Sequence, residues 1–365
     1  MEAFVAIAIL FLASAVTSFV ATRITKVAAE EIGLVDRPDD RKHHDREIPR
    51  IGGLAIIFGF GFPLLLLAAN SHAAGLVSKN LPFLFAMLAS GSLVVGLGVY
   101  DDLVGANAPK KFIVQTAAAV ILVSFGYQFK FVSLAGQVVH LGILGYVISV
   151  IWIVGVINAM NFIDGMDSLA TVVSFTIAVA FAIIAIVRLD AFSLIVMTAL
   201  AGSLAGFYWW NKPPARIFMG DSGSMFIGLL LAAGSIAKPS KSPTAIIITG
   251  PIIALALPVL DTLIVMKERF GGPATPIAKR LGRLFNADRR HIHHILLVRF
   301  GSEGKAIASI WLVTLLFAAA AVMTAIDLTK VVGYSAGILG LVAMIALRYE
   351  RRRHKRDTTS VRNVA

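Results

Sequence analysis

Short polar clusters interrupt an otherwise apolar sequence, and the first is the adjacent pair Asp101-Asp102, followed by Lys110-Lys111. Neighbouring carboxylates repel each other and are costly near hydrocarbon unless a cation offsets them. Their oxygens suit Mg²⁺, which usually takes one or two carboxylates together with substrate phosphates. The pair therefore predicts a cation site, although a solvated acidic helix end would have the same sequence.

A second cluster places Asn158, Asn161, Asp164 and Asp167 at steps of three. Residues three apart share one side of a helical turn, so these side chains should converge. Gly165, between the two aspartates, permits a sharp change of backbone direction. Two amides and two carboxylates could hold a metal, a nucleobase or a ribose; the alternative, a capped helix end, needs only one of them.

Small residues begin two of the apolar segments, at Gly52-Gly53 and at Gly220-Asp221-Ser222. Glycines at a helix N-terminus allow close backbone approach, and exposed N–H groups there attract phosphate. Asp221 would repel that phosphate unless Mg²⁺ bridges the two groups. An ordinary Asp/Ser N-cap is the alternative for this cluster.

Two basic segments also contain histidine, one over residues 37–50 and the other over 288–294. Arg and His side chains can bind a pyrophosphate, and His can relay protons near neutral pH. The candidate phosphate ligands are Arg41, Lys42, His44, Arg50, Arg289, His291, His293 and His294. The alternatives are a Zn²⁺ site that includes His43 and His44, or solvated basic loops.

Membrane-spanning helices must position these clusters, because 58% of the 365 residues are apolar and only 15% are charged. A bilayer core of about 30 Å needs roughly 20 apolar residues in a helix. The candidate segments are 3–22, 51–69, 81–100, 112–128, 141–160, 169–187, 191–210, 222–237, 244–266, 306–326 and 331–348. The sequence therefore predicts an all-α, polytopic integral membrane protein with about 11 transmembrane helices. Residues 129–140 alternate in polarity and predict a small hairpin.

The basic residues predict the orientation of these helices, because Lys and Arg gather in cytoplasmic loops. One set of loops holds 27 of the 33 basic residues and the other holds 6, which places the N-terminus outside and the C-terminus in the cytoplasm. Every polar cluster then lies on the cytoplasmic face. We expect one membrane-embedded domain, 1–348, whose cytoplasmic loops are 23–50, 101–111, 158–168, 210–221 and 267–305, and a basic tail, 349–365. The basic run from Arg348 predicts an anchor on anionic lipid.

Composition excludes several other classes of protein. The net charge is +12, but the apolar runs explain it as loop charge and argue against nucleic-acid binding. Cysteine is absent, which excludes disulfides and thiolate metal sites. The first residues lack the basic region of a cleaved signal peptide, so the first apolar run should stay as a helix. Asp261 lies within an apolar segment, and we expect it to pair or hydrogen-bond, with Arg269 on the same helix stripe.

In this order, the clusters resemble the polyprenyl-phosphate N-acetylhexosamine-1-phosphate transferase family, over about residues 35–295. The likeness is greatest to the bacterial enzymes that transfer N-acetylglucosamine-1-phosphate to undecaprenyl phosphate. Ile292 interrupts the histidines, unlike the three consecutive histidines of the related enzyme that uses UDP-MurNAc-pentapeptide. Two departures are Ser168, where the family usually has Gly, and Arg283 to Asn286, which replaces a Ser-Pro-Phe-like stretch.

The resemblance implies that Mg²⁺, or Mn²⁺, is held by Asp221 with Asn161 or Asp102 nearby. It assigns catalysis to Asp101, Asp102, Asp164, Asp167 and the three histidines of 291–294. The implied substrate-binding residues are Arg41, Lys42, His44, Arg50, Lys110, Asn158, Asn161 and Arg289. Substrates would be a UDP-N-acetylhexosamine and undecaprenyl phosphate, and a one-step attack on the β-phosphorus and a two-step aspartyl-phosphate route both remain open.

Other substrates, and one other class of membrane protein, fit part of the same sequence. The pentapeptide substrate and other UDP-N-acetylhexosamines are alternatives within the family. From another class, a secondary transporter could use Asp261 and residues 158–167, but transporters usually show an internal repeat with polar breaks near the midplane. We expect the protein in the bacterial inner membrane, as a multi-pass protein whose active site faces the cytoplasm; a homodimer is a further expectation.

Overall fold

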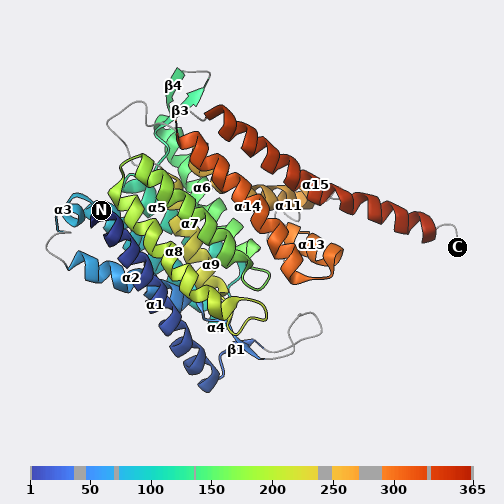
Figure 1. Cartoon of the computed structure of the whole chain (residues 1–365), viewed down its shortest axis with the longest axis horizontal. Coiled ribbons are helices and arrows are strands. Elements are labelled where there is room, and N and C mark those ends of the chain that lie inside the picture. Colours follow the sequence, from blue (N-terminus) through green and yellow to red (C-terminus); the bar gives the residue numbers. More distant parts are fainter. Residues whose placement is uncertain are drawn as a thin grey trace.

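The chain folds into a bundle of long helices with two short antiparallel hairpins (Figure 1). The computed structural model describes residues 2–36, 47–69, 74–134, 137–236, 249–270, 290–326 and 330–362. The helices are α1 (Glu2–Glu31), α2 (Gly53–Ala68), α3 (Ala74–Lys79), α4 (Leu81–Val104), α5 (Ala108–Ser124), α6 (Gly142–Ile163), α7 (Leu169–Val187), α8 (Ala191–Asn211), α9 (Gly220–Ser235), α10 (Thr249–Ala254), α11 (Ala256–Phe270), α13 (Ile292–Phe300), α14 (Glu303–Ala325) and α15 (Lys330–Arg362).

The strands lie at opposite ends of the bundle (Figure 1). β3 (Phe131–Leu134) pairs with β4 (Gln137–His140), which confirms the hairpin predicted over 129–140. The sequence did not predict the other pair, β1 (Val35–Asp36) with β2 (Ile48–Pro49). Two residues per strand are too few for a period-2 pattern to be recognised.

The described part of each apolar segment expected to span the membrane is mainly helical. Within the described residues, six helices are long and apolar enough to cross a bilayer, namely those in α1, α4, α6, α7, α8 and α14. α2 and residues 332–348 of α15 are shorter apolar helices. The chain is therefore a helical, multi-pass membrane protein, as its composition predicted.

Burial differs between the centre and the edge of the bundle. α9 is almost entirely buried and packs against α6, α4 and α2, whereas α1 exposes large apolar side chains such as Phe4, Ile9 and Leu12. Apolar side chains on the outside of a bundle are what a hydrocarbon solvent favours. Buried apolar residues from Ile56 to Met344 form one core, so the central α9 is held on several sides.

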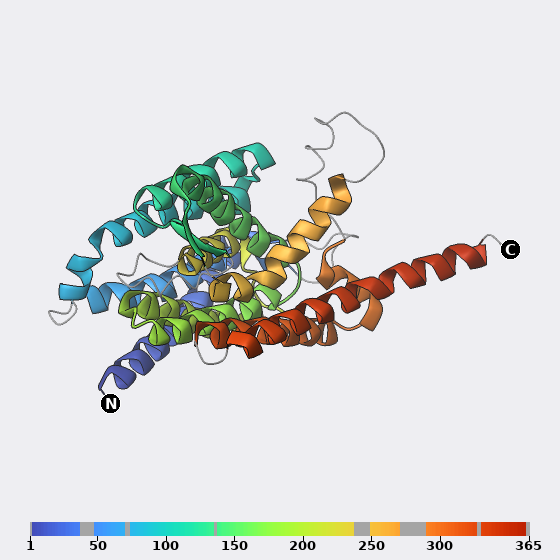
Figure 2. The same ribbon diagram turned by 90° about the horizontal axis from the view of Figure 1, so that it is seen from above.

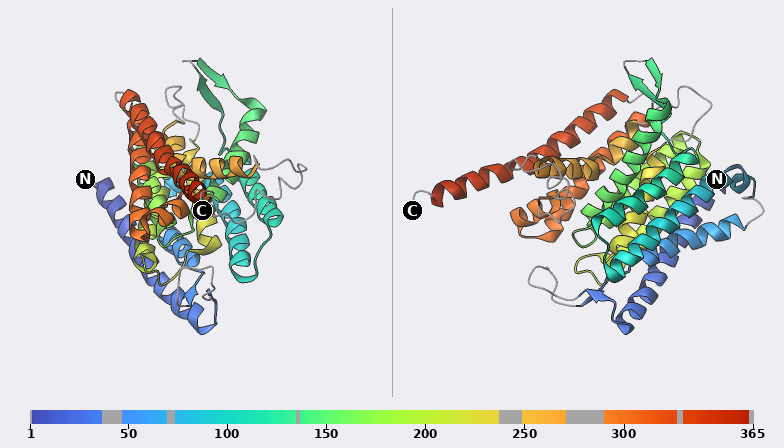
Figure 3. Two further views of the ribbon diagram at one scale, coloured as in Figure 1. Left: turned by 90° about the vertical axis from the view of Figure 1, so that its right-hand side faces the viewer. Right: turned by 180° about the vertical axis from the view of Figure 1, so that it is seen from behind.

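The described part of the expected span over 244–266 is divided between two helices, a break that the apolar run did not predict. The two helices are α10 and α11, which meet at Leu255. Pro258 lacks an N–H for the carbonyl of Ala254, and its ring crowds that carbonyl, so a continuous helix is broken there. α11 consequently leaves the bundle at an angle to the long helices (Figures 2 and 3).

The C-terminal part adds two features that hydropathy did not predict. α13 is a short helix within the expected loop 267–305, and α15 continues beyond the apolar segment through the basic tail to Arg362. Figure 1 shows the end of α15 extending well past the other helices. The helix therefore begins against α14 in the bundle and ends outside it.

Candidate functional site

Asp102 links the first acidic pair to the start of α9. Its Oδ1 accepts the backbone N–H of Asp221 at 2.7 Å, and its Oδ2 accepts that of Ser222 at 3.1 Å. A carboxylate on these N–H groups satisfies donors that a helix N-terminus leaves unpaired, and it meets the positive end of the helix dipole. The N–H groups that we expected to attract phosphate are thus taken by a side chain of α4.

Glycines allow this close approach. A Cβ on Gly98 would lie 2.3 Å from the Cα of Ser222, and one on Gly53 would lie 2.2 Å from the nitrogen of Gly223. Gly52 and Gly53 donate their N–H groups to the carbonyls of Phe218 and Met219 at 3.0 and 2.7 Å. The paired glycines therefore bring α2 against the segment before α9, and they do not present their N–H groups to a ligand.

Lys111 joins two acidic clusters. Its Nζ lies 2.8 Å from Oδ2 of Asp101 and 2.5 Å from Oδ2 of Asp221. The predicted residue, Lys110, instead lies over the ring of Tyr100, at 5.6 Å from its centroid. Lys111 lies on the same side of α5 as the buried Gln115, four residues later. This polar pair at helical spacing was a sequence signal that could have identified Lys111 as the site residue.

The end of α6 is held by its polar side chains. Asn158 donates to Oε1 of Gln115 at 2.6 Å, and Asn161 donates to Oγ of Ser224 at 2.9 Å. Asp167 accepts the N–H of Ala215 at 2.7 Å. These predicted site residues therefore lie beside α5, α9 and the segment after α8.

Asp164 ends α6 among other acidic groups. Surrounding protein atoms raise its pKa to about 8, and the charges of Asp221, Asp102 and Asp167 add to this, against an opposing effect of Arg50. At neutral pH the carboxyl therefore holds a proton for most of the time. Arg50 itself is partly exposed, with Nη1 3.5 Å from Oδ1 of Asp36.

Ser168, one of the two departures from the family pattern, starts α7 with φ of 59° and ψ of −3°. This is the left-handed region, where a residue with a Cβ is strained and glycine is not. The backbone therefore explains why glycine is usual at this position.

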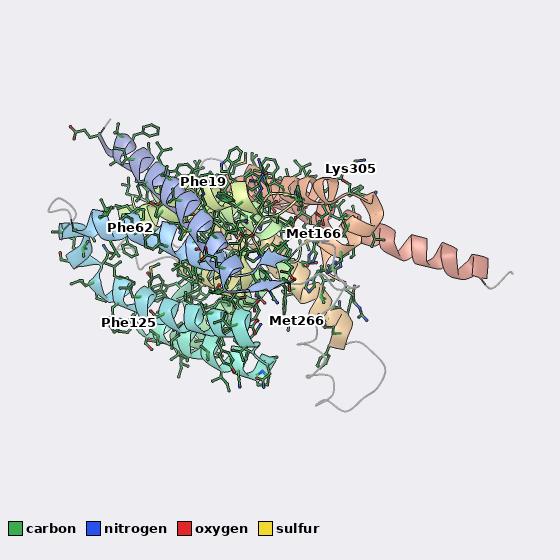
Figure 4. The ribbon with its side chains drawn as sticks, turned by 90° about the horizontal axis from the view of Figure 1, so that it is seen from below. Phe19, Phe62, Phe125, Met166, Met266 and Lys305 are labelled. Carbon is green, nitrogen blue, oxygen red and sulfur yellow. The ribbon has the colours of Figure 1, made fainter. Side chains whose placement is uncertain are left out.

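The histidines pack against the loop between α6 and α7. His291 occupies the N-cap position of α13. Its Nδ1 lies 2.7 Å from Oδ2 of Asp261, and its ring lies beside that of Phe162. A Cβ on Gly165 would lie 2.4 Å from Nε2 of His293. Figure 4 labels Met166 of the same loop, which in this view projects between Lys305 of α14 and Met266 of α11.

His293 is a buried, neutral ring. Burial, together with the charges of His294 and His291, lowers its pKa to about 3. Among the described residues, neither ring nitrogen has a hydrogen-bond partner. The His293 ring is therefore neutral near neutral pH and keeps a single N–H, and the role of the histidine motif stays a prediction. His294 packs on it with ring centroids 4.2 Å apart.

The described parts of the polar clusters thus meet at one place, and the roles of their residues stay predictions. Arg41, Lys42, His44 and Arg289 lie outside the described residues, as does His43 of the Zn²⁺ alternative. No group of three acidic or histidine side chains with metal-site geometry occurs in the described ranges. A cation there would need substrate oxygens besides the carboxylates, which is how Mg²⁺ usually binds.

The chain is similar to several proteins named as transferases of phosphorylated N-acetyl sugars. The model of glycosyl transferase family 4 matches residues 84–238. A probable undecaprenyl-phosphate N-acetylglucosaminyl 1-phosphate transferase of Bacillus subtilis (strain 168) is 32% identical over 327 residues, 88% of this chain and 86% of the relative. A decaprenyl-phosphate N-acetylglucosaminephosphotransferase of Mycolicibacterium smegmatis is 30% identical, covering 84% and 79%. A phospho-N-acetylmuramoyl-pentapeptide-transferase of Sulfurimonas denitrificans is also 30% identical, covering 76% and 80%.

Proposed function

The chain belongs to the polyprenyl-phosphate N-acetylglucosamine-1-phosphate transferases of glycosyl transferase family 4, and from that premise we propose its reaction. It transfers N-acetylglucosamine-1-phosphate from UDP-N-acetylglucosamine to undecaprenyl phosphate and releases UMP. This step begins the synthesis of a lipid-linked cell-surface glycan. The observation that carries the proposal is a carboxylate cluster at the helix ends of a membrane bundle. Asp101 and Asp221 meet at Lys111, and Asp102 accepts the backbone N–H of Asp221.

Mg²⁺ fits this donor set. Asp101 and Asp221 share one ammonium group, so their oxygens already lie where a cation is favoured. We assign Asp221 as the principal ligand, with Asn161 and Asp102 as the other candidates, and Mn²⁺ could replace Mg²⁺. When bound, the ion would neutralise charge on the pyrophosphate and on the departing UMP.

The protein residues then bind and orient the substrates. An oxygen of the lipid phosphate forms a bond to the β-phosphorus of the UDP-sugar, and the bond from that phosphorus to the oxygen bridging to UMP breaks. The second pKa of a phosphate monoester is about 6, so the acceptor is already ionised and base catalysis contributes little. Positioning by Asp101, Asp164, Asp167 and the histidines should dominate.

The lipid acceptor has an apolar groove near these carboxylates. A groove of about 490 Å³ lies between α4 and α5 and is lined by residues that include Leu93, Tyr100, Ile113 and Lys110. A prenyl chain in it would bring its phosphate to Lys110, which supports the predicted substrate-binding role of that residue. Arg41, Lys42, His44, Arg50, Asn158 and Arg289 complete the proposed substrate-binding set.

We further propose the predicted topology. Residues 1–348 form one transferase domain that crosses the bacterial inner membrane eleven times, and 349–365 form its basic tail. The N-terminus is outside, the C-terminus and active site face the cytoplasm, and the chain acts as a homodimer. The 27-to-6 division of basic residues supports the orientation.

The test uses the purified protein, undecaprenyl phosphate and radiolabelled UDP-N-acetylglucosamine, with and without Mg²⁺. We expect label in the lipid phase, UMP in equal amount, and no product with EDTA. Asp221→Asn should lose nearly all turnover while it stays folded in detergent, and so should Asp102→Asn. Product with UDP-MurNAc-pentapeptide alone would reassign the substrate, and no product with any UDP-sugar would overturn the proposal.

A further inference from the structure

Asp261 is a buried acid outside the carboxylate cluster described above. It lies on α11 and its side chain is 3% exposed. Oδ2 lies 2.7 Å from Nδ1 of His291, and Oδ1 accepts the backbone N–H of Ile292 at 3.0 Å. The carboxylate therefore holds both the ring and the backbone at the start of α13.

Arg348 of α15 supplies the compensating charge. Its Nη1 lies 2.5 Å from Oδ1 of Asp261, and its Nη2 donates to the carbonyl of Arg290 at 3.1 Å. The side chain is only 10% exposed. Arg348 therefore points into the protein, which corrects our expectation that it begins a lipid anchor, and Asp261 pairs with Arg348 instead of Arg269.

These contacts lead from the C-terminal helix to the candidate site. The His291 ring is stacked on that of His293, with an angle of 9° between the planes, and it lies 5.4 Å from the ring of Phe162 at the end of α6. A carboxylate on Nδ1 selects the tautomer with the proton on that nitrogen and leaves Nε2 as an acceptor.

We propose that Asp261 and Arg348 are positioning residues for His291. Asp261 fixes the tautomer and plane of the His291 ring, and Arg348 holds both Asp261 and the Arg290 carbonyl in place. The segment that carries the histidine motif is thus locked to α11 and to α15. This inference rests on the proposed function, because it assumes that His291 serves the transfer reaction.

The kinetic experiment measures kcat and KM for Arg348→Met, Arg348→Lys and Asp261→Asn in the lipid-labelling assay. We expect kcat to fall by about 10–100-fold in Arg348→Met and Asp261→Asn, the loss that follows removal of a histidine's orienting partner in metal sites. Arg348→Lys should recover part of it. Arg299→Met is the control, because it removes a positive charge from the exposed side of α13 and should keep the wild-type rate.

A double variant tests whether Arg348 acts through His291. Arg348→Met combined with His291→Gln should be no slower than His291→Gln alone, since residues that act as a unit are not additive. Additive losses would mean that Arg348 matters only for general stability, which would overturn the proposal.

A spectroscopic experiment tests the same contacts without any reaction. In protein with ¹⁵N-labelled histidine, the His291 ring, assigned from its loss in His291→Gln, should show a protonated Nδ1. Asp261→Asn should change that pattern and Arg299→Met should not. Unchanged ring shifts in Asp261→Asn would overturn the inference. If Asp261→Asn does not fold, the same measurement on Arg348→Met decides, and a wild-type pattern of His291 ring shifts in Arg348→Met would overturn the inference. If the wild type makes no lipid product, the proposed function fails while the ring pattern still decides the positioning of His291.

Discussion

Lys111→Gln should destabilise the protein more than the same substitution at any other described lysine. At an effective dielectric constant of 20, an ion pair at 2.8 Å gains about 6 kcal/mol, much of which offsets desolvation. Removal of one partner from a buried pair typically costs about 3–5 kcal/mol. Lys111 and its two carboxylates keep 13–22% exposure, so we expect about 3 kcal/mol.

The assay is thermal unfolding in detergent, with EDTA and then with excess Mg²⁺. A loss of about 3 kcal/mol should lower Tm by roughly 4 °C, because an unfolding entropy of about 2.1 cal/mol/K per residue amounts to about 0.8 kcal/mol/K over 365 residues. Added Mg²⁺ should reduce the difference in Tm between the variant and the wild type, because the ion can neutralise the two carboxylates that no longer have the Lys111 ammonium group beside them. Lys110→Gln is the matched control, because Lys110 lies over the Tyr100 ring and not between carboxylates. This variant should melt within about 1 °C of wild type. Equal Tm values for Lys111→Gln and Lys110→Gln would refute this account of the carboxylate cluster.

Three other changes test the same region. Burial raises the pKa of Asp164 to about 8, so the stability that this carboxyl contributes is complete below about pH 4 and is lost as pH rises through 8. Asp164→Asn should therefore flatten the fall in Tm between pH 6 and 9, measured in EDTA. An unchanged slope of Tm against pH would contradict this. Gly98→Ala should cost about 1–3 kcal/mol and most of the turnover, because its Cβ meets Ser222. Gly155→Ala, with open space around it and outside the groove, should do neither. Ser168→Gly should relieve left-handed strain and stabilise by about 0.5–1 kcal/mol in the same melts, and a lower Tm would show that this strain is not significant.

Hydropathy and charge predicted the parts of the molecule that depend on local sequence. The apolar segments lie on helices, the 129–140 hairpin is present, and the acidic, amide and histidine clusters meet. These features follow from segment length and from the cost of burying polar groups in hydrocarbon, both of which a single sequence displays.

Contacts between distant segments could not be predicted in the same way. Asp102 binds backbone N–H groups more than a hundred residues away, and no property of the acidic pair identifies that partner. The choice between Lys110 and Lys111 depends on which side of α5 faces the bundle, and the polar Gln115, four residues after Lys111, is the one sequence signal for that side. Arg348 begins a basic run whose composition is typical of a lipid anchor. Only its position beside Asp261 shows that its side chain pairs inside the protein.

The contact between Arg348 and Asp261 also bears on how the protein is made. Synthesis runs from the N-terminus, so the carboxylate cluster and α9 are inserted into the membrane well before Arg348 leaves the ribosome. Until then Asp261 lacks its cation, and a buried carboxylate without a partner is unfavourable. The histidine segment should therefore settle only when α15 docks, which makes completion of the whole chain a condition for a working enzyme.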